Sequence, residues 1–293
     1  MQPPFDLSVI LAEARGNPAL DPPLAAIECA CEGIRAEVLV VRCAGRPALR
    51  SSSIVALREL TVDESLLVPE RWGVGVRAAQ APVFACLTTE LTPAPTWARS
   101  LLEALRTGAA GAASALALAP GAGARAAAVY LVRFSAFLPG NDGDFRPRHD
   151  MPGDGAAYRR DAVVAFPELL AQGFWEAEFH RRFHAQGSAL VYASDPLVSF
   201  DSAVSLGDIM SVRARHGRGY GQTMVADGRR SAARLVLGAP AVPAVLLLRI
   251  FRRAARAPGM LWQAMRSLPA LLMICSAWAW GEGGGAWAAR KPR

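Results

Sequence analysis

The residues best suited to chemistry lie between positions 173 and 186. Glu176, His180 and His184 are spaced i, i+4 and i+8, which places them on one face of a helix. A carboxylate and two imidazoles on one face are able to hold a metal ion, although the pattern HExxH is absent. Glu178 and Arg182 have the spacing of an i,i+4 ion pair, so a solvated helix explains the same charges. Spacing alone leaves both interpretations open.

A second group of polar residues surrounds the stretch 140–155 (GNDGDFRPRHDMPGDG). Its density of Gly, Pro, Asp and Asn predicts a loop. Gly153 and Gly155 fit a tight turn around Asp154. The two arginines that follow, Arg159 and Arg160, are placed either to approach a phosphate or to pair with acids.

The elements that position these residues follow from the hydrophobic pattern. Short apolar runs predict buried strands, and periodic segments that begin at prolines predict helices. Alternating strands and helices form a parallel sheet covered on both faces, with ligands at the carboxyl ends of its strands. We therefore expect the segments after Val41, after Leu87 and around 153–178 to converge. The predicted strands are 7–12, 37–41, 81–87, 112–118 and 189–192, and the predicted helices are 21–31, 69–79, 95–105 and 173–186.

The charge balance does not favour a nucleic-acid partner. The net charge is +7, but Lys291 is the only lysine, and aromatic residues do not interleave with the arginines as a stacking platform requires. The five cysteines have no zinc-type spacing, which fits buried free thiols in a reducing compartment. The N-terminal residues MQPPFD lack the basic and apolar regions of a secretory signal, so we expect the N-terminal domain to stay in the cytoplasm.

Several segments, taken in order, resemble the GT-A domain of family 2 glycosyltransferases over roughly residues 7–220. The opening strand with SVI is followed by EVLVV, as in the family. The later segments are VPERWGVG (68–75), PVFACLTTELTPAPTW (82–97), MPGDGAAYRRD (151–161) and GFWEAEFHRRF (173–183) followed by Gln186 and Gly187.

The resemblance implies a GT-A fold over residues 1–221, that is, a Rossmann-like mixed but mainly parallel sheet flanked by helices. It also implies a nucleotide-sugar donor. Trp175 and Glu176 stand where the family has a Glu-Asp pair, which makes Glu176 the base that takes the proton of the acceptor hydroxyl in an inverting transfer. Asp154, Trp175 and Arg159 fall on the acceptor side.

On the donor side the sequence departs from the family. Thr88 and Glu90 occupy the two positions of the Asp-x-Asp motif, so only Glu90 offers a carboxylate to Mg²⁺ or Mn²⁺. Arg42-Cys43 replaces the aspartate after the second strand, and Ser199-Phe200 stands where the family often has a metal-binding histidine.

Two explanations account for these departures. In a metal-sparing enzyme, fixed cations neutralise the leaving diphosphate, and Arg213, Arg215 and Arg218 are the candidates. Alternatively, the chain is a degenerate member that binds a sugar nucleotide or a partner without transferring a sugar.

The tail, residues 222–293, is hydrophobic and rich in arginine. Two uncharged runs, 235–248 and 267–280, are shorter than the approximately 20 residues that a bilayer crossing requires. Arginines beside them and Trp262, Trp278 and Trp280 predict amphipathic or re-entrant segments on the cytoplasmic leaflet. The alternative is that these helices pack on the GT-A domain or on a second subunit, giving a homo-oligomer.

Together, the residues and the resemblance predict a glycosyltransferase at the cytoplasmic face of the inner membrane. The acceptor would be a lipid-linked glycan or a polysaccharide of the cell envelope. The alternative function is a catalytically degenerate binding or scaffold protein with the same fold.

Overall fold

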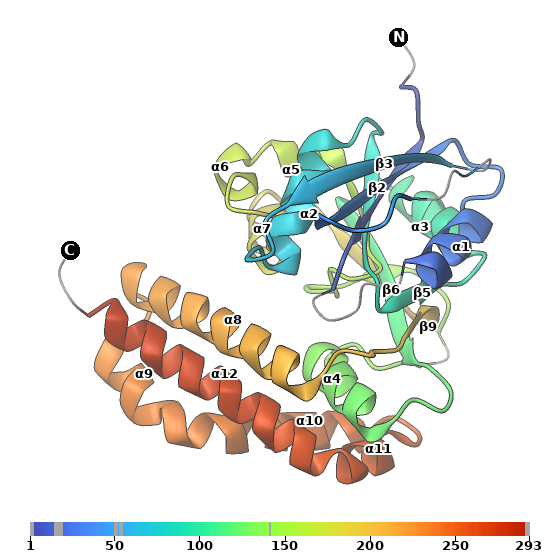
Figure 1. Ribbon diagram of the computed structural model, residues 1–293. Coiled ribbons are helices and arrows are strands. Elements are labelled where there is room, and N and C mark those ends of the chain that lie inside the picture. The colour runs from blue at the N-terminus through green and yellow to red at the C-terminus, as the bar shows by residue number, and fades with distance from the viewer. Residues whose placement is uncertain (1–2, 15–19, 50–51, 53–54, 141, 291–293) are drawn as a thin grey trace. The chain divides into compact units, whose positions relative to one another are not determined.

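The computed structural model describes residues 3–14, 20–49, 52, 55–140 and 142–290, and the chain forms two compact units (Figure 1). The sheet unit comprises Met1–Ala119 and Pro139–Phe200, and the helical unit comprises Pro120–Leu138 and Asp201–Arg293. This division differs from the predicted boundary after Gly221, which falls inside the continuous helix α8 (Leu206–Ala226). Moreover, α4 (Ala124–Phe134) lies within the predicted first domain but packs on α11 (Met260–Arg266) and α12 (Leu268–Ala288).

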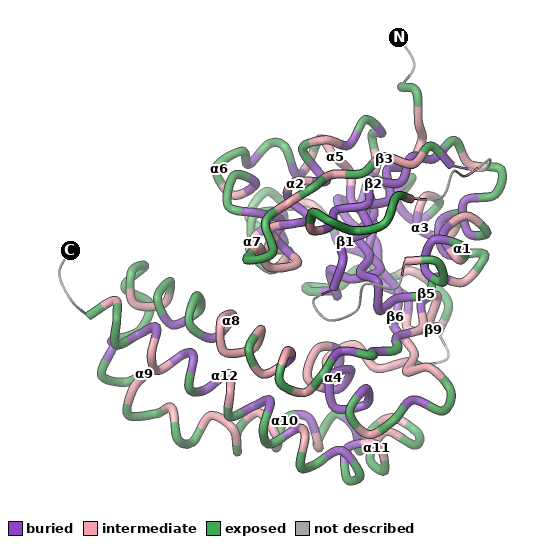
Figure 2. Tube along the Cα trace, in the orientation of Figure 1, coloured by how far each residue is buried: buried purple, intermediate pink, exposed green. Residues whose placement is uncertain are grey.

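One half of the sheet is parallel, in the order β3-β2-β1-β4. The strands β1 (Leu7–Ala12), β2 (Ala36–Cys43) and β4 (Val83–Thr88) are apolar and buried almost throughout, as strands covered on both faces are (Figure 2). The edge strand β3 (Ala56–Val62) is only partly buried. Helix α1 (Asp21–Ala30) connects β1 to β2, and helix α2 (Val68–Ala78) connects β3 to β4, in the opposite direction along the sheet. Because such connections are right-handed, the two helices lie on opposite faces of the sheet.

The other half of the sheet is mixed. The short strand β8 (Ala157–Arg159) runs antiparallel to both β4 and β6 (Gly111–Leu118), and β9 (Leu190–Phe200) runs parallel to β6. Two short strands, β5 (Leu91–Pro93) and β7 (Arg146–Pro147), pair antiparallel with β9. The helices of this half are α3 (Trp97–Leu105), α5 (Arg160–Val164), α6 (Pro167–Leu170) and α7 (Glu176–Ala185). The predicted fold class, a mixed and mainly parallel sheet flanked by helices and followed by a hydrophobic helical tail, is confirmed.

A cluster of aromatic side chains fixes α7 to the sheet. Tyr158 on β8 stacks on Phe84 of β4, with ring centroids 5.6 Å apart, and meets Phe174 edge-on at 4.9 Å. Phe174 in turn contacts Phe179 of α7, also at 4.9 Å. All four rings are fully buried. Because such rings bury much apolar area and pack in defined geometries, they set the position of the first turn of α7.

The helical unit contains α4, α8, α9 (Ala232–Gly238), the 3₁₀ turn η1 (Ala239–Ala241), α10 (Val242–Ala254), α11 and α12. The helices α8 and α12 lie side by side (Figure 1). Gly217 and Gly221 on α8 face the backbone of α12, while Gly281 and Gly285 on α12 face the backbone of α8. Each pair has GxxxG spacing, which lets two helix backbones approach closely.

Among the described residues, every exposed large apolar side chain except Val164 belongs to the helical unit. Leu237, Trp280 and Trp262 are 82%, 80% and 63% exposed. One stretch, Ala232–Ala254, is long and apolar enough to cross a bilayer by length and composition alone, with 23 residues and a mean hydropathy of 1.8. Only 11% of its apolar window is buried. A single stretch of this kind is weak evidence for a crossing.

The two predicted tail segments differ in their surroundings. The run 235–248 is divided among α9, η1 and α10, and the break falls at Pro240, which lacks a backbone donor. The run 267–280 lies in α12, where Leu271, Ile274 and Cys275 are buried within the helical unit. The second run therefore contributes substantially to the interior of this unit.

Candidate functional site

The carboxyl ends of β1, β2 and β4 meet at one edge of the sheet. Ala12 pairs with Val41 on one side and with Thr88 on the other, so β1 and β4 end level with one another and β2 continues to Cys43. Buried polar residues follow immediately: Glu13 is 3% exposed, Thr88 0%, and Glu90 5%. This is the edge where ligands bind in open α/β sheets.

Asp154 reaches the same edge through the loop before β8. The Gly155 amide donates to the Cys86 carbonyl at 2.8 Å, and the Cys86 amide donates to the Ala156 carbonyl at 2.9 Å, which continues the pairing with β4. Gly155 has a φ of 76°, a left-handed conformation that glycine adopts readily. The turn brings the Asp154 side chain to a buried position, 5% exposed, at the carboxyl end of β4.

Glu176 is the first residue of α7 and packs on this loop. A Cβ atom on Gly153 would lie 2.9 Å from Glu176 Cγ and 3.0 Å from Cδ, so glycine leaves the space that the glutamate side chain fills. Trp175 precedes the helix, and its Nε1 donates to the Gln172 carbonyl at 3.1 Å. Gly153, Asp154 and Glu176 are therefore neighbours.

The surroundings of Glu176 favour its neutral form. The residue keeps a partly exposed surface, but its carboxyl group lies among protein atoms, and this burial raises the pKa of the carboxyl above its ordinary value. His180 and the backbone at the helix start act in the opposite direction, and the negative charges of Asp154 and Asp150 raise the pKa further. A carboxyl group with a raised pKa at a ligand-binding edge fits a general base.

His180 is part of a buried hydrogen-bonded chain. Its Nδ1 lies 2.7 Å from Asp150 Oδ1, and its Nε2 lies 3.0 Å from the Tyr158 hydroxyl. His184, one turn further, directs Nε2 to the His149 carbonyl at 2.5 Å. Among the described residues, no group of three or more His, Cys, Asp or Glu side chains is arranged to hold a metal ion. The three-residue stripe on α7 is thus engaged in other contacts.

Thr88 and Glu90 do not form a good site for a divalent cation. Mg²⁺ and Mn²⁺ prefer several oxygen ligands with carboxylates among them, and of these two positions only Glu90 carries a carboxylate. The Thr88 hydroxyl is buried without a hydrogen-bond partner in the described part of the chain. The residues present do not fit a protein-held metal, so no chemical step is assigned to one.

The last residues of β2 and the loop positions around them are occupied by internal ion pairs and hydrogen bonds. Arg42 donates to both oxygens of Glu59, at 2.8 and 2.6 Å, and is 3% exposed. Glu13 accepts the Cys43 amide at 3.1 Å and pairs with Arg46. The buried Arg71 donates to the Glu13 carbonyl at 2.7 Å. Cations and carboxylates in this region therefore stabilise the end of β2.

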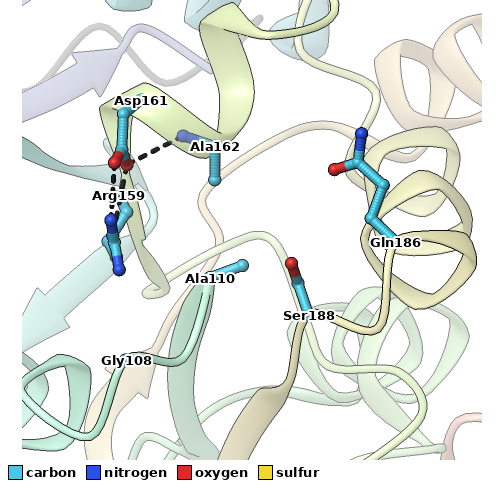
Figure 3. Close-up of a pocket in the computed structure, with 7 residues that line it drawn as sticks. All are labelled: Gly108, Ala110, Arg159, Asp161, Ala162, Gln186 and Ser188. Carbon is cyan, nitrogen blue, oxygen red and sulfur yellow. Dashed lines mark hydrogen bonds and ion pairs between the residues drawn. The ribbon is translucent and has the colours of Figure 1, made fainter.

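Arg159 lies at the opposite edge of the sheet from Asp154. It pairs with Val83, the first residue of β4, and its guanidinium forms an ion pair with Asp161 at 2.5 Å. Both line a shallow pocket of about 210 Å³ beside Ser188, at the amino ends of β6 and β9 (Figure 3). This placement does not support the predicted role of Arg159 on the acceptor side, because strand β8 takes the chain from Asp154 at one edge of the sheet to Arg159 at the other.

Arg215 and Arg218 lie on α8, in the helical unit. The nearby Arg213 places its guanidinium over the Trp278 ring, 4.6 Å from the centroid. Their assignment to a diphosphate stays a prediction.

Comparisons with known proteins give only a distant likeness. No protein-family model matches the sequence, and no curated protein matches it. A crystal structure of S. aureus TarS 1-349 in complex with UDP-GlcNAc is similar with a TM-score of 0.49 and 7% identity, covering 92% of this chain and 90% of that chain. The crystal structure of S. aureus TarS 1-349 is similar with a TM-score of 0.49 and 10% identity, covering 92% of this chain and 89% of that chain. Its complex with UDP is similar with a TM-score of 0.47 and 9% identity, with the same coverage of 92% and 89%. Similarity of this degree does not assign the chain to a family.

Three residues of the site were not predicted in their observed roles. Asp150 lies in the predicted loop, Tyr158 lies in a short strand, and the spacing of His180 predicts either a metal ligand or a solvated side chain. The one signal in the sequence was the i,i+4 spacing of Glu176 and His180. Their partners come from positions 22 and 30 residues away, which spacing on one helix cannot reveal.

Proposed function

We propose that the chain is an inverting glycosyltransferase that moves a sugar from a nucleotide-sugar donor to a lipid-linked or polysaccharide acceptor. The observation that carries this proposal is the placement of Glu176 and Asp154 together at the carboxyl edge of the sheet. A second contact supports it: Trp97 Nε1 donates to the Gly155 carbonyl at 2.9 Å. Two of the segments on which the family resemblance rests, 82–97 and 151–161, are thus in direct contact.

In the proposed reaction, the Glu176 carboxylate takes the proton of an acceptor hydroxyl while that oxygen attacks the anomeric carbon of the donor sugar. The bond from this carbon to the diphosphate oxygen breaks, and the nucleoside diphosphate leaves with the electron pair. Asp154 and Trp175 border the acceptor. Thr88 and Glu90 face the donor diphosphate. The metal-sparing version of the proposal assigns neutralisation of the diphosphate charge to Arg215 and Arg218.

A binding protein without transferase activity is the second candidate. It is favoured by the single carboxylate at Thr88–Glu90 and by the pairing of Arg42 with Glu59, which removes the polar anchor expected for the nucleotide base. Such a protein would bind a sugar nucleotide at the same edge and leave it intact.

Release of nucleoside diphosphate from a panel of sugar nucleotides, with membrane lipid extracts and with glycans as acceptors, separates the two candidates. We expect one donor to be consumed in an acceptor-dependent manner, with a rate that changes little when Mn²⁺ is replaced by a chelator. Binding of a donor without acceptor-dependent release under any of these conditions would contradict the transferase and support the binding protein.

We further propose that the helical unit attaches the protein to the cytoplasmic leaflet of the plasma membrane as a peripheral or re-entrant element. The exposed tryptophans and the arginines of α10 and α11 support this, because tryptophan favours the membrane interface and arginine binds anionic headgroups. The same surface is the one through which a homo-oligomer would form.

Replacement of Trp262 and Trp280 by serine should weaken binding to anionic phospholipid vesicles by about tenfold or more, since two large exposed apolar side chains are lost. Flotation of the full chain with vesicles measures this. Val164→Ser, at the exposed apolar side chain of the sheet unit, is the matched control and should float like the wild type. If the wild-type protein does not float, the membrane proposal is wrong.

A further inference from the structure

The carboxyl group of Glu176 faces an electrostatic problem if it is a base. Burial and the nearby carboxylates of Asp154 and Asp150 favour the protonated form, which cannot accept a proton. A base in this position requires a neighbouring group that favours the ionised form. Within the described residues, the ionisable groups that influence this region are Glu176 and His180 of α7, His149, Asp150 and Asp154 of the preceding loop, Tyr158 of β8 and Cys86 of β4.

Of the two histidines in this set, His180 is the one that lowers the pKa of Glu176, and its position is firmly fixed. It lies one helical turn after Glu176, on the same face, and is 2% exposed. Asp150 holds Nδ1 at 2.7 Å and the Tyr158 hydroxyl holds Nε2 at 3.0 Å. Tyr158 is in turn fixed by its stacking on Phe84. Both ring nitrogens therefore have partners, and the imidazole cannot rotate without losing two hydrogen bonds.

The two partners allow the ring to change its charge in place. The Asp150 carboxylate accepts a hydrogen bond from Nδ1–H and so favours a proton on that nitrogen. A tyrosine hydroxyl both donates and accepts, so Tyr158 donates to Nε2 of a neutral ring or accepts from Nε2–H of a charged ring. The pKa of Tyr158 is raised well above its ordinary value by burial, so this hydroxyl keeps its proton. Neither protonation state of the imidazole leaves a buried nitrogen unsatisfied.

We propose that His180, held between Asp150 and Tyr158, is a positioning residue that keeps the carboxyl group of Glu176 ionised. This inference rests on the proposed role of Glu176 as the base. The imidazolium stabilises the carboxylate one turn away. The Asp150 side chain is 57% exposed, whereas that of His180 is 3% exposed, so Asp150 also connects the buried ring to solvent, with which the ring exchanges its proton.

The test is a pH titration of the Glu176 carboxyl carbon by NMR, in full-length protein labelled with ¹³C at the glutamate carboxyl. The Glu176 signal is the one that disappears in Glu176→Gln. In His180→Gln we expect the titration midpoint of Glu176 to rise by about one pH unit, the size of effect that loss of an adjacent opposite charge produces. His184→Gln, four residues further along the same helix, is the matched control and should leave the midpoint unchanged.

A second measurement does not depend on substituting the buried ring. In Asp150→Asn, the ¹⁵N chemical shifts of the His180 ring, compared with the wild type at one pH, should move toward those of a neutral imidazole, because the carboxylate that stabilises the imidazolium is gone. An identical Glu176 midpoint in the wild type and His180→Gln, or unchanged ¹⁵N chemical shifts of the His180 ring in Asp150→Asn, would overturn the inference.

Neither measurement requires turnover, so the transferase proposal and the proposed role of His180 can each be contradicted without the other. A shifted Glu176 midpoint without any donor consumption would contradict the transferase function and leave the positioning role intact. Donor consumption with an unchanged Glu176 midpoint in His180→Gln would support the transferase function and contradict the positioning role of His180.

Discussion

Glu176→Gln is expected to reduce the rate of sugar transfer by about 10²- to 10⁴-fold, the range that a positioned general base contributes. Glutamine keeps the shape of the side chain that packs on Gly153 but cannot accept a proton. The fold should therefore survive, and donor binding should stay within about threefold of the wild type, because the change does not touch the donor side. The measurements are kcat from nucleoside diphosphate release and donor affinity by calorimetry.

Glu178→Gln provides the matched control for this prediction. Glu178 lies two residues further along α7, is 40% exposed in its side chain, and forms a surface ion pair with Arg181. Exposed pairs of this kind contribute at most about 1 kcal/mol. We expect transfer at nearly the wild-type rate. Equal rates for Glu176→Gln and the wild type would remove Glu176 from the reaction.

Gly281→Ala is expected to destabilise the helical unit by about 2–3 kcal/mol, the upper part of the range for overpacking a close contact. A Cβ atom at this position would meet the backbone of α8 at Ala214, and backbone cannot move aside as a flexible side chain can. The two helices would have to separate, which weakens the contacts along their whole length. Unfolding by denaturant, followed by circular dichroism, measures the loss.

The same helix contains a control with the opposite expectation. A Cβ atom on Gly284 would have Arg218 Nη2 as its nearest neighbour, at 3.9 Å, which is an ordinary contact. Gly284→Ala therefore gains helix propensity without a clash and should stabilise α12 by up to about 1 kcal/mol. If both alanines have the same effect on the unfolding midpoint, the close packing of α8 on α12 is not what stabilises the unit.

The parts of the fold that could be predicted are those with a strong local signal. The runs LSVILA and EVLVV are apolar and rich in branched residues, and both form buried strands at the predicted places. The edge strand β3 and the helix α4 were not predicted. β3 mixes charged and apolar residues because only one side of it is covered, and α4 lies in an Ala- and Gly-rich stretch whose composition fits several structures.

Which candidate residues lie near one another could be predicted where this depends on sequence order, and could not where it depends on the path of the chain. Asp154 and Glu176 come together because a loop and a helix start meet at the carboxyl edge. Arg159 is only five residues after Asp154, but an extended strand advances about 3.3 Å per residue, so β8 moves it to the other edge. Likewise, the partners of His180 are set by the tertiary fold, in which a loop, a strand and a helix converge.

The stereochemistry of transfer tests the central claim most directly, because a single displacement with Glu176 as base inverts the anomeric carbon. The measurement is proton NMR of the product formed from the donor that the sugar-nucleotide panel identifies, read at the anomeric signal. The account predicts that an α-linked donor gives a β-linked product in the wild type and that Glu176→Gln gives almost none. A product that retains the α configuration would contradict it.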